Sequence, residues 1–454
     1  MSKLKSRLAL VLAAAMLLGA TACSQAPSSS AGGDTSSPSS VSTGNENEKP
    51  YDGTTITFAA SQNWIKDIDR EMAEKFKEET GITVDFQLSP DDQYQEIIKS
   101  KLNTGEGVDI FMSYSGAQLA GFNPEQNMVE LSNEPWVDKM KEWAIAGSSY
   151  NGKLYAFNMC SADVTNGVMY QPEMFKKYNL EVPKNYEEFK NVCKVLKENG
   201  VTPIYEFVQD LWHAHYWMEG AATKAYERDN TVLDKLNKNE IGFADVPEFE
   251  TALNQIKELA DLGYLGENHM SNNYDNSYKA IASGEYGMII IHSSYPNEMI
   301  GALEKDPDKD KLNLDAASYS MFANPLADNT GVTLTAGGPT RCISAKSKNI
   351  EACKEYFKFL SQQENAQAIY DKRTEFMEAS IEGVNGTPTA AYTAISAVKP
   401  QILGPEAAVY FYQGGKVSEY MQELFTGSMD AKGVLQAFDE HRRALAKDAG
   451  YEGF

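Results

Sequence analysis

The chain has 454 residues, with 64 acidic and 41 basic side chains and a formal net charge of −23. An acidic surface of this kind argues against nucleic acid as a partner and against anionic ligands drawn in by a broad positive field, and it leaves neutral ligands open. The length is more than one hydrophobic core usually serves and is typical of two lobes.

The first residues read as an export signal. Three basic side chains within the first seven positions precede an apolar run over residues 8–18, and small residues lead from it to Cys23. The run is too short to cross a hydrocarbon core of about 30 Å, so residues 1–22 are predicted to be a signal peptide. The cleavage region resembles a bacterial lipobox, with Ala20 where that motif usually has Leu, and Cys23 is predicted to be lipidated. A plain signal peptide with a chance cysteine is the alternative.

Residues 23–50 contain mainly Ser, Gly, Pro, Thr, Asn and Glu and almost no large apolar side chain. Such a segment cannot bury enough surface to fold, so we expect a flexible tether. Two acyl chains on a cysteine anchor a protein stably. A lipid followed by a tether predicts a folded part that works on the extracellular face of the cell membrane.

Residues 55–115 predict the order strand, open loop, helix, strand, helix, strand. Apolar residues recur at three- and four-residue steps over 65–76 and 94–102 and alternate over 82–88. Gly81 is expected to end the first helix and Ser89 to cap the second. Ligands of parallel sheets sit beyond the carboxyl ends of the strands. The candidate contacts at two such ends are Gln62, Asn63, Trp64, Ser113 and Ser115.

Two segments of this stretch, MAEKFKEETGITVDFQ and YQEIIKSKLNTGEGVDIFMSYS, resemble the opening of the family 1 extracellular solute-binding proteins. These proteins capture the substrate for ABC-type sugar importers. Further segments resemble the family in the expected order, including ASGEYGMIIIHSSYPNEM and SKNIEACKEYFKFLSQQENAQAIY, so that the resemblance covers residues 55–445.

The resemblance implies an α/β fold with two lobes, like the type II periplasmic binding proteins. Each lobe is expected to hold a mostly parallel sheet flanked by helices, with crossing hinge strands between the lobes. Lobe 1 is assigned to residues 51–157 and 338–385, and lobe 2 to residues 158–337 and 386–454. The segment over residues 331–343 resembles a crossing strand of the family.

The most aromatic stretch is DLWHAHYWMEG, residues 210–220. On a helix, Trp212 and Tyr216 share one face, while His213 and Trp217 share another. The flat apolar face of a sugar ring stacks on aromatic rings, and its hydroxyls find polar neighbours. We therefore expect Trp212 and His213 to face a ligand, with Trp217 as a further candidate. The alternative is that both faces are buried in a core.

Polar residues after later strands extend the candidate site. His292 and Ser293 follow a predicted buried strand over residues 286–291, although His292 is also read as a buried structural histidine. Asp163 lies in a loop of lobe 2 and is expected to accept hydrogen bonds from hydroxyl groups. A plain loop aspartate is the alternative.

Two glycines and an arginine complete the candidate set. Gly337 and Gly338 are expected to let the backbone approach a ligand or absorb hinge rotation. Arg373 is expected either to donate a fork of hydrogen bonds to neighbouring hydroxyls or to lie on the surface.

No metal or cofactor is predicted. The five histidines are spread along the chain, and His213 and His215 point to different helix faces, whereas zinc needs three or four converging ligands. Four further cysteines lack metal-ligand spacing. They are expected to be buried free thiols, with a disulfide left open: Cys160, Cys193, Cys342 and Cys353. Asn151 and Gly152 are expected to form a tight hairpin turn followed by a strand. Residues 221–240 are expected to be a surface insertion, and residues 247–265 an amphipathic helix.

The sequence therefore predicts a monomeric, lipid-anchored carrier of carbohydrate that closes its two lobes on a sugar and presents it to the permease subunits of an importer. The affinity is expected near micromolar, about −8 kcal/mol. One competing hypothesis is a secreted glycosidase, which needs two opposed carboxylates. Gly-x-Ser-x-Gly and His-Glu-x-x-His motifs are absent from the sequence. The other keeps the fold and changes the ligand to a peptide or another small solute.

Overall fold

The structure is a computed structural model, and it describes residues 51–105, 107–161, 167–451 and 454, apart from the side chain of Asp92. The expected signal peptide, Cys23 and the tether lie outside the described residues, and so does Asp163. No helix in the described part of the chain combines the length and the apolar character that a bilayer crossing requires.

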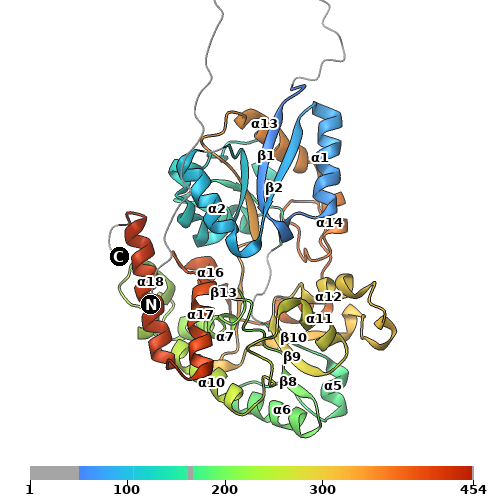
Figure 1. The fold of residues 1–454 in the computed structure, drawn as a ribbon, viewed down its shortest axis with the longest axis vertical. Helices are drawn as coiled ribbons and strands as arrows, with labels where there is room; N and C mark the ends of the chain where they lie inside the picture. The colour runs from blue at the N-terminus through green and yellow to red at the C-terminus, as the bar shows by residue number, and fades with distance from the viewer. Residues whose placement is uncertain (1–50, 106, 162–166, 452–453) are drawn as a thin grey trace, which may run out of the picture. The chain divides into compact units, whose positions relative to one another are not determined.

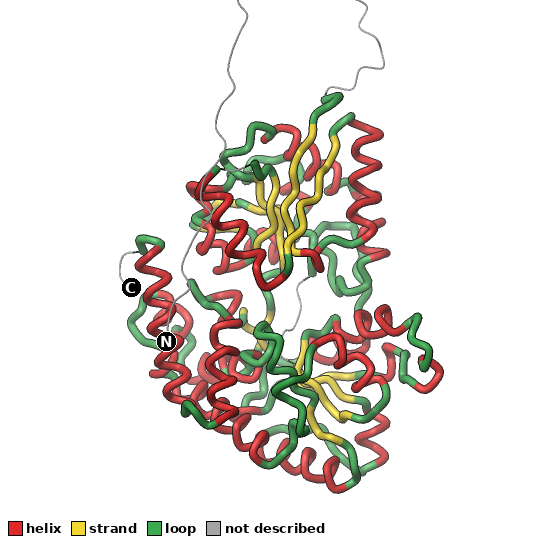
Figure 2. The backbone as a smooth tube through the Cα atoms, viewed as in Figure 1, coloured by secondary structure: helices red, strands yellow, loops and turns green. Residues whose placement is uncertain are grey.

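Two sheets organise the chain (Figures 1 and 2). The first consists of β1 (Thr55–Ser61), β2 (Thr83–Ser89), β3 (Ile110–Tyr114), β6 (Ala156–Phe157) and β12 (Pro339–Ile343). Their order is β2-β1-β3-β12-β6. Strands β1, β2 and β3 are parallel, whereas β12 runs antiparallel to both of its neighbours.

Helices cover both faces of this first sheet. They are α1 (Asp67–Thr80), α2 (Asp91–Thr104), α3 (Pro124–Asn127), α4 (Glu142–Gly147), α13 (Ile350–Leu360) and α14 (Gln363–Lys372), with the 3₁₀ turns η1 (Gln62–Trp64) and η2 (Gly116–Phe122). Ile110 and Met112 pack in the cluster that contains Phe76 of α1 and Phe357 of α13. Phe111, between them, packs with Ile98 of α2 on the other face. The alternation along β3 follows the two-residue period of a strand.

The second sheet consists of β7 (Gly167–Tyr170), β8 (Thr202–Ile204), β9 (Tyr286–Ile291) and β10 (Ser320–Ala323), in the order β10-β7-β9-β8. Strand β7 runs antiparallel to β10 and β9, and β8 is parallel to β9. In each sheet, therefore, one strand opposes all the others. That strand is β12 in the first sheet and β7 in the second.

Two helical layers enclose the second sheet. The helices are α5 (Pro172–Lys177), α6 (Tyr186–Glu198), α7 (Tyr216–Glu219), α8 (Ala222–Arg228), α9 (Val232–Asn237), α10 (Pro247–Asp261), α11 (Tyr274–Ala282), α12 (Tyr295–Leu303), α15 (Ala390–Ser396), α16 (Pro405–Ala408), α17 (Gly414–Thr426) and α18 (Ala431–Asp448). Ile290 packs in the cluster that contains Phe249 of α10 and Phe438 of α18. Ile289 and Ile291 pack on the opposite face with Met299 of α12. A strand buried on both faces reads as a continuous apolar run.

The chain passes three times between the body built on the first sheet, here the first lobe, and the body built on the second, the second lobe. The passages lie between β6 and β7, between β11 (Val332–Leu334) and β12, and between α14 and α15. Figure 1 shows the late helices α13 and α14 beside the early helix α1, which they contact. Strand β11 pairs with β13 (Gln401–Leu403) rather than with either large sheet.

Several local predictions are confirmed. Gly81 ends α1 with φ of 85°, and its N–H bonds to the carbonyl of Lys77. Asn151 and Gly152, with φ of 48° and 76°, turn the hairpin of β4 (Ser149–Tyr150) and β5 (Lys153–Leu154). The predicted strand over residues 286–291 matches β9. All four of the remaining cysteines are buried free thiols.

Three local predictions are wrong. Residues 211–215 form turns instead of a helix, and within the stretch only Tyr216–Glu219 is helical. The side chain of His213 bonds to the carbonyl of Ile290 in the second sheet. Residues 221–240 form α8 and α9, which bury Ala222 and Leu236 in the core instead of lying on the surface as an insertion. Ser89 ends β2 and caps nothing, since Pro90 holds the N-cap position of α2.

Candidate functional site

The carboxyl ends of β1, β2 and β3 meet at one edge of the first sheet. The Trp64 ring lies 5.2 Å from the Tyr94 ring and 5.1 Å from the Tyr114 ring, both edge to face. Ser61 and Asn63 donate hydrogen bonds to Asp91, which follows β2. The structure thus gathers aromatic and polar groups where the topology predicts a ligand.

The predicted residues of this edge differ in accessibility. Gln62 and Asn63 are exposed and Trp64 is half-buried. Ser113 is buried, and its hydroxyl bonds to the carbonyl of Tyr114. Ser115 is buried as well and donates to the carbonyl of Gly338 at 2.8 Å. The candidate ligand contacts predicted from the sequence did not include Asp91 or Tyr114, although both lie at strand ends, where such contacts are expected.

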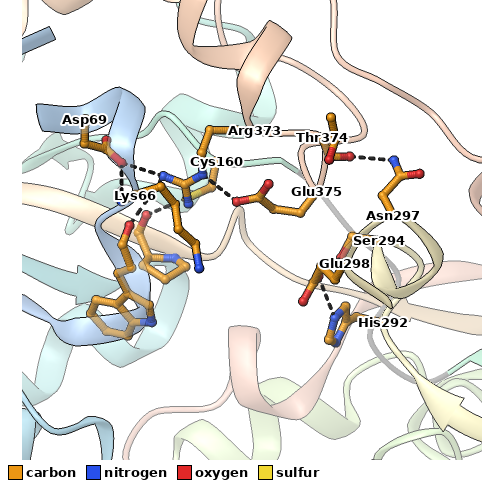
Figure 3. Close-up of polar contacts among 12 residues, drawn as sticks. Lys66, Asp69, Cys160, His292, Ser294, Asn297, Glu298, Arg373, Thr374 and Glu375 are labelled. Carbon is orange, nitrogen blue, oxygen red and sulfur yellow. Dashed lines mark hydrogen bonds and ion pairs between the residues drawn. The ribbon is translucent and has the colours of Figure 1, made fainter. Parts of the chain in front are cut away.

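Arg373 lies in a buried ionic network of the first lobe (Figure 3). Its Nη1 donates to Asp69 at 2.8 Å, and its Nε donates to Glu375. Asp69 also accepts a bond from Arg341 at 3.1 Å. Figure 3 shows the guanidinium between the two carboxylates of Asp69 and Glu375. Because Arg373 is buried, the predicted surface position is wrong. Internal carboxylates use its Nε and Nη1 donors, and the predicted fork to a ligand stays a prediction.

In the second lobe, the side chain of Trp212 reaches the surface, with an exposed fraction of 36%. Its ring lies 5.1 Å from that of Tyr274, 5.3 Å from that of Phe207 and 6.2 Å from that of His292. The Tyr274 and Phe207 rings meet the indole edge to face, and the His292 ring is tilted against it. The exposed part of Trp212 is therefore a rigid apolar platform beside polar groups.

His213 and Trp217 do not reach the surface, so their predicted contact with a ligand needs correction. The ring of His213 bonds to the carboxylate of Glu206 at 2.9 Å and to the carbonyl of Ile290 at 2.7 Å. The indole N–H of Trp217 also bonds to Glu206. All three side chains are fully buried. A histidine whose two ring nitrogens have internal partners is a structural one.

His292 follows β9 and is half-buried. Its Nε2 lies 2.9 Å from Glu298, which also accepts bonds from Tyr274 at 2.8 Å and from Ser294 at 3.0 Å. Burial by itself raises the pKa of Glu298, but the charge and bond of His292 and the two hydroxyl bonds outweigh it and lower the pKa to about 2. The predicted neighbour Ser293 is buried.

The second lobe also bonds to the passage between α14 and α15. Asn297 of α12 donates to the carbonyl of Thr374 at 2.6 Å, as Figure 3 shows, and to that of Thr387 at 3.3 Å. Thr389 donates to the carbonyl of Ser293 at 3.3 Å. The segment that contains Arg373 and Glu375 is therefore hydrogen-bonded to α12, the helix that carries Glu298.

The two predicted glycines lie where β12 begins. Gly337 has φ of 110° and Gly338 has φ of 65°, in the region that side chains rarely adopt. A Cβ on Gly337 would lie 2.3 Å from the amide nitrogen of Asn158, whose side chain donates to the carbonyl of Gly337. Gly337 thus allows its backbone to lie close to the side chain of Asn158, at a passage between the lobes.

A cavity of about 100 Å³ opens beside Gly338. Its lining combines the end of β3 and η2 with α7, the segment before β12, and α16. The polar groups in the lining include Tyr114, Gln118, Glu219 and Glu406. The sequence offered no motif for Glu219 or Glu406, because residues so far apart are brought together only by the fold.

Histidine, cysteine, aspartate and glutamate side chains nowhere gather in threes, within the described ranges, in a way that could hold a metal ion. Asp163 and Cys23 remain untested, since both lie outside those ranges.

Comparison with known proteins adds the following. A family model for bacterial extracellular solute-binding proteins matches residues 62–367, more than half of the chain. The alpha-glucosides-binding periplasmic protein AglE of Rhizobium meliloti is 29% identical over 189 residues, which are 37% of this chain and 39% of AglE. The multiple sugar-binding protein of Streptococcus mutans is 21% identical over 279 residues, 61% of this chain and 63% of that protein. The matched regions thus span less than two thirds of both curated relatives.

Among solved structures, RafE in complex with raffinose superposes with a TM-score of 0.69 at 18% identity, covering 86% of this chain and 99% of that one. At this identity the likeness establishes the fold. It supports the expected two-lobe architecture.

Proposed function

We propose a function from one premise: this chain belongs to the family of bacterial extracellular solute-binding proteins. On that premise it captures a sugar or oligosaccharide outside the cell and delivers it to the membrane permease of an ABC importer. Carbohydrate is the proposed ligand class, because AglE and the multiple sugar-binding protein are named for sugars and RafE was solved with raffinose.

The single observation that carries the proposal is the surface around Trp212. An indole that is 36% exposed and packs against Tyr274 and Phe207 offers an apolar aromatic surface. His292 and Glu298 lie beside it, with a carboxylate that stays charged at neutral pH. A pyranose presents an apolar face and a ring of hydroxyls, which matches a platform flanked by hydrogen-bonding groups.

The first lobe supplies a second aromatic and polar group at Trp64, Asn63 and Asp91. We propose that the sugar contacts both lobes, with lobe 1 formed by residues 51–157 and 338–385 and lobe 2 by residues 158–337 and 386–454. A ligand that contacts both lobes shifts the population toward a closed form. The permease would then recognise that closed form.

The rest of the proposal concerns place and chemistry. Cys23 carries the lipid that holds the protein at the outer face of the membrane, and the protein works as a monomer. The sugar is released unchanged, because the charged carboxylate of Glu298 at the platform is fixed by internal bonds and the family consists of binding proteins. Asp163 contributes a carboxylate that accepts hydroxyl bonds.

Thermal unfolding of the purified full chain tests the proposal with a panel of mono- and oligosaccharides, and with di- and tripeptides as the competing class. At least one sugar is expected to raise the melting temperature at a saturating concentration and to be recovered intact. If peptides stabilise the protein and no sugar does, the ligand class is wrong. If a sugar is hydrolysed, the protein is an enzyme.

A further inference from the structure

The cavity beside Gly338 is acidic. Its lining residues all lie in the described part of the chain; two of them are glutamates, Glu219 and Glu406, and none is lysine or arginine. Glu219 ends α7 and Glu406 lies in α16, so the fold brings the two carboxyl groups into one small space. Such a space attracts hydrogen-bond donors and repels anions.

Glu219 is held at one oxygen only. Its Oε1 accepts the backbone N–H of Glu406 at 3.0 Å and lies 3.4 Å from Nδ1 of His215. The side chain is only 1% exposed, yet its Oε2 has no hydrogen-bond partner among the described residues. An unpaired buried carboxylate oxygen is costly, because it has lost its water without gaining a donor.

Gly404 keeps the approach to this oxygen open. It lines the same cavity, and a Cβ at this position would lie 3.1 Å from Cβ of Thr333 and 3.3 Å from Oε2 of Glu219. Its backbone angles, φ −66° and ψ 161°, are ordinary for any residue. What this glycine provides is therefore space next to Oε2.

We propose that Glu219 and Glu406 form an acidic subsite that binds a hydrogen-bond-donating group of the captured solute, a hydroxyl of a neutral sugar or the ammonium of an amino sugar. The inference rests on the proposed function, since it concerns how the same solute is recognised. The volume of about 100 Å³ suits one substituent of a sugar and not the whole ligand.

The surroundings of Glu406 agree with this assignment. Burial and the nearby Glu219 raise the pKa of Glu406 to about 7, against the lowering effect of His215 and of a bond from Gln118. Tyr412 bonds to Nδ1 of His215 at 3.3 Å and also to the carboxylate of Glu219. Burial lowers the pKa of His215, but Glu219 and Glu406 outweigh it and raise the pKa. Even with these neighbours, Oε2 of Glu219 has no donor among the described residues, and a solute group would supply one.

Calorimetric titration of the full chain tests the subsite with three probes: raffinose, glucose, and glucosamine, in which an ammonium replaces one hydroxyl of glucose. Glu219→Gln turns the acceptor at Oε2 into a donor and is expected to weaken the tightest probe by about tenfold to a hundredfold. Gly404→Ala narrows the access to Oε2 of Glu219 without changing the charge of the cavity. It is also expected to weaken binding of the tightest probe. The control is Glu173→Gln, on a side chain 85% exposed.

The outcomes separate as follows. Glucosamine binding more tightly than glucose supports the ammonium, and the reverse order supports the hydroxyl. Wild-type affinities in both Glu219→Gln and Gly404→Ala, with cooperative unfolding of each, would overturn the subsite and leave the proposed function standing. If none of these probes or any other sugar binds the wild-type chain, the proposed function fails and the subsite with it.

Discussion

At the scale of single residues, solvent exposure separates the aromatic side chains that can contact a solute from those that pack beneath them. Trp212 and His213 are adjacent, yet Trp212 reaches the surface while His213 is fully buried between Glu206 and the carbonyl of Ile290. The aromatic richness of this stretch could be read from the sequence. Which ring faces outward could not, because it depends on turns fixed by contacts with distant strands.

Replacing Trp212 tests the platform. We expect Trp212→Ala to weaken sugar binding by about tenfold to a hundredfold, since a central tryptophan often dominates a binding surface. Leu211→Ala is the matched control, because the neighbouring leucine is 39% exposed. Isothermal titration gives both affinities. Equal loss in the two variants, or no loss in either, would contradict a special role for the indole.

Glu406 gives a prediction for pH dependence. Its pKa in the folded protein is about 7, against an ordinary value of 4.5, so the proton favours the folded state. Its contribution to stability is complete below about pH 4.5 and is lost as the pH rises to about 7. The groups that face it are Glu219, His215, Gln118, Tyr114 and Tyr412.

Urea unfolding at pH 5 and pH 8 measures this effect. We expect the wild-type chain to lose more stability between the two values than Glu406→Gln, in which the titrating group is gone. Because the charge of Glu406 also raises the pKa of His215, the difference between the two proteins reports Glu406 together with its effect on His215. Identical pH dependence in the two proteins would show that the carboxyl group titrates normally.

At the scale of elements, the sequence correctly predicted structures that depend only on neighbouring residues. The apolar run of β9, the left-handed Gly81 and the Asn151-Gly152 turn each depend on a few neighbouring residues, and each was confirmed. The prediction for residues 221–240 failed, because charged and polar side chains are interspersed with the apolar ones in α8 and α9. Helix α8 packs against α10, β11 and α9, and no local pattern reports such contacts.

The passage into β12 provides an element-scale prediction. Gly337→Ala is expected to destabilise the protein by about 1–3 kcal/mol, since φ of 110° strains a side chain and the new Cβ would lie against Asn158. Gly121→Ala serves as control, because nothing lies within 4 Å of a Cβ there. Urea unfolding compares both with the wild type. Equal stability of the Gly337 variant would mean that the passage adjusts freely.

At the scale of the whole molecule, two cores joined by three passages make the proposed closure possible. Each sheet is covered on both faces by its own helices, so each body keeps its packing if the passages bend. The order of the sequence motifs predicted this architecture, and the comparisons support it. The contacts across the passages could not be predicted, because they join residues that lie far apart in the sequence, such as Asn297 and Thr374.

Closure itself is measurable by small-angle X-ray scattering. We expect the radius of gyration of the full chain to fall when a binding sugar is added to saturation. Trp212→Ala at the same sugar concentration should show a smaller change, because fewer molecules are occupied. An unchanged radius in a wild-type sample shown to be saturated would mean that capture proceeds without closure.

The central claim is that the protein binds a sugar reversibly and does not alter it. Isothermal titration of the wild-type chain with a panel of oligosaccharides, followed by chromatography of the recovered sugar, tests this directly. The account predicts one sugar bound per chain with a dissociation constant near 1 μM, about −8 kcal/mol, and recovery of the intact compound. Absence of binding by every sugar in the panel, or recovery of cleaved products, would contradict it.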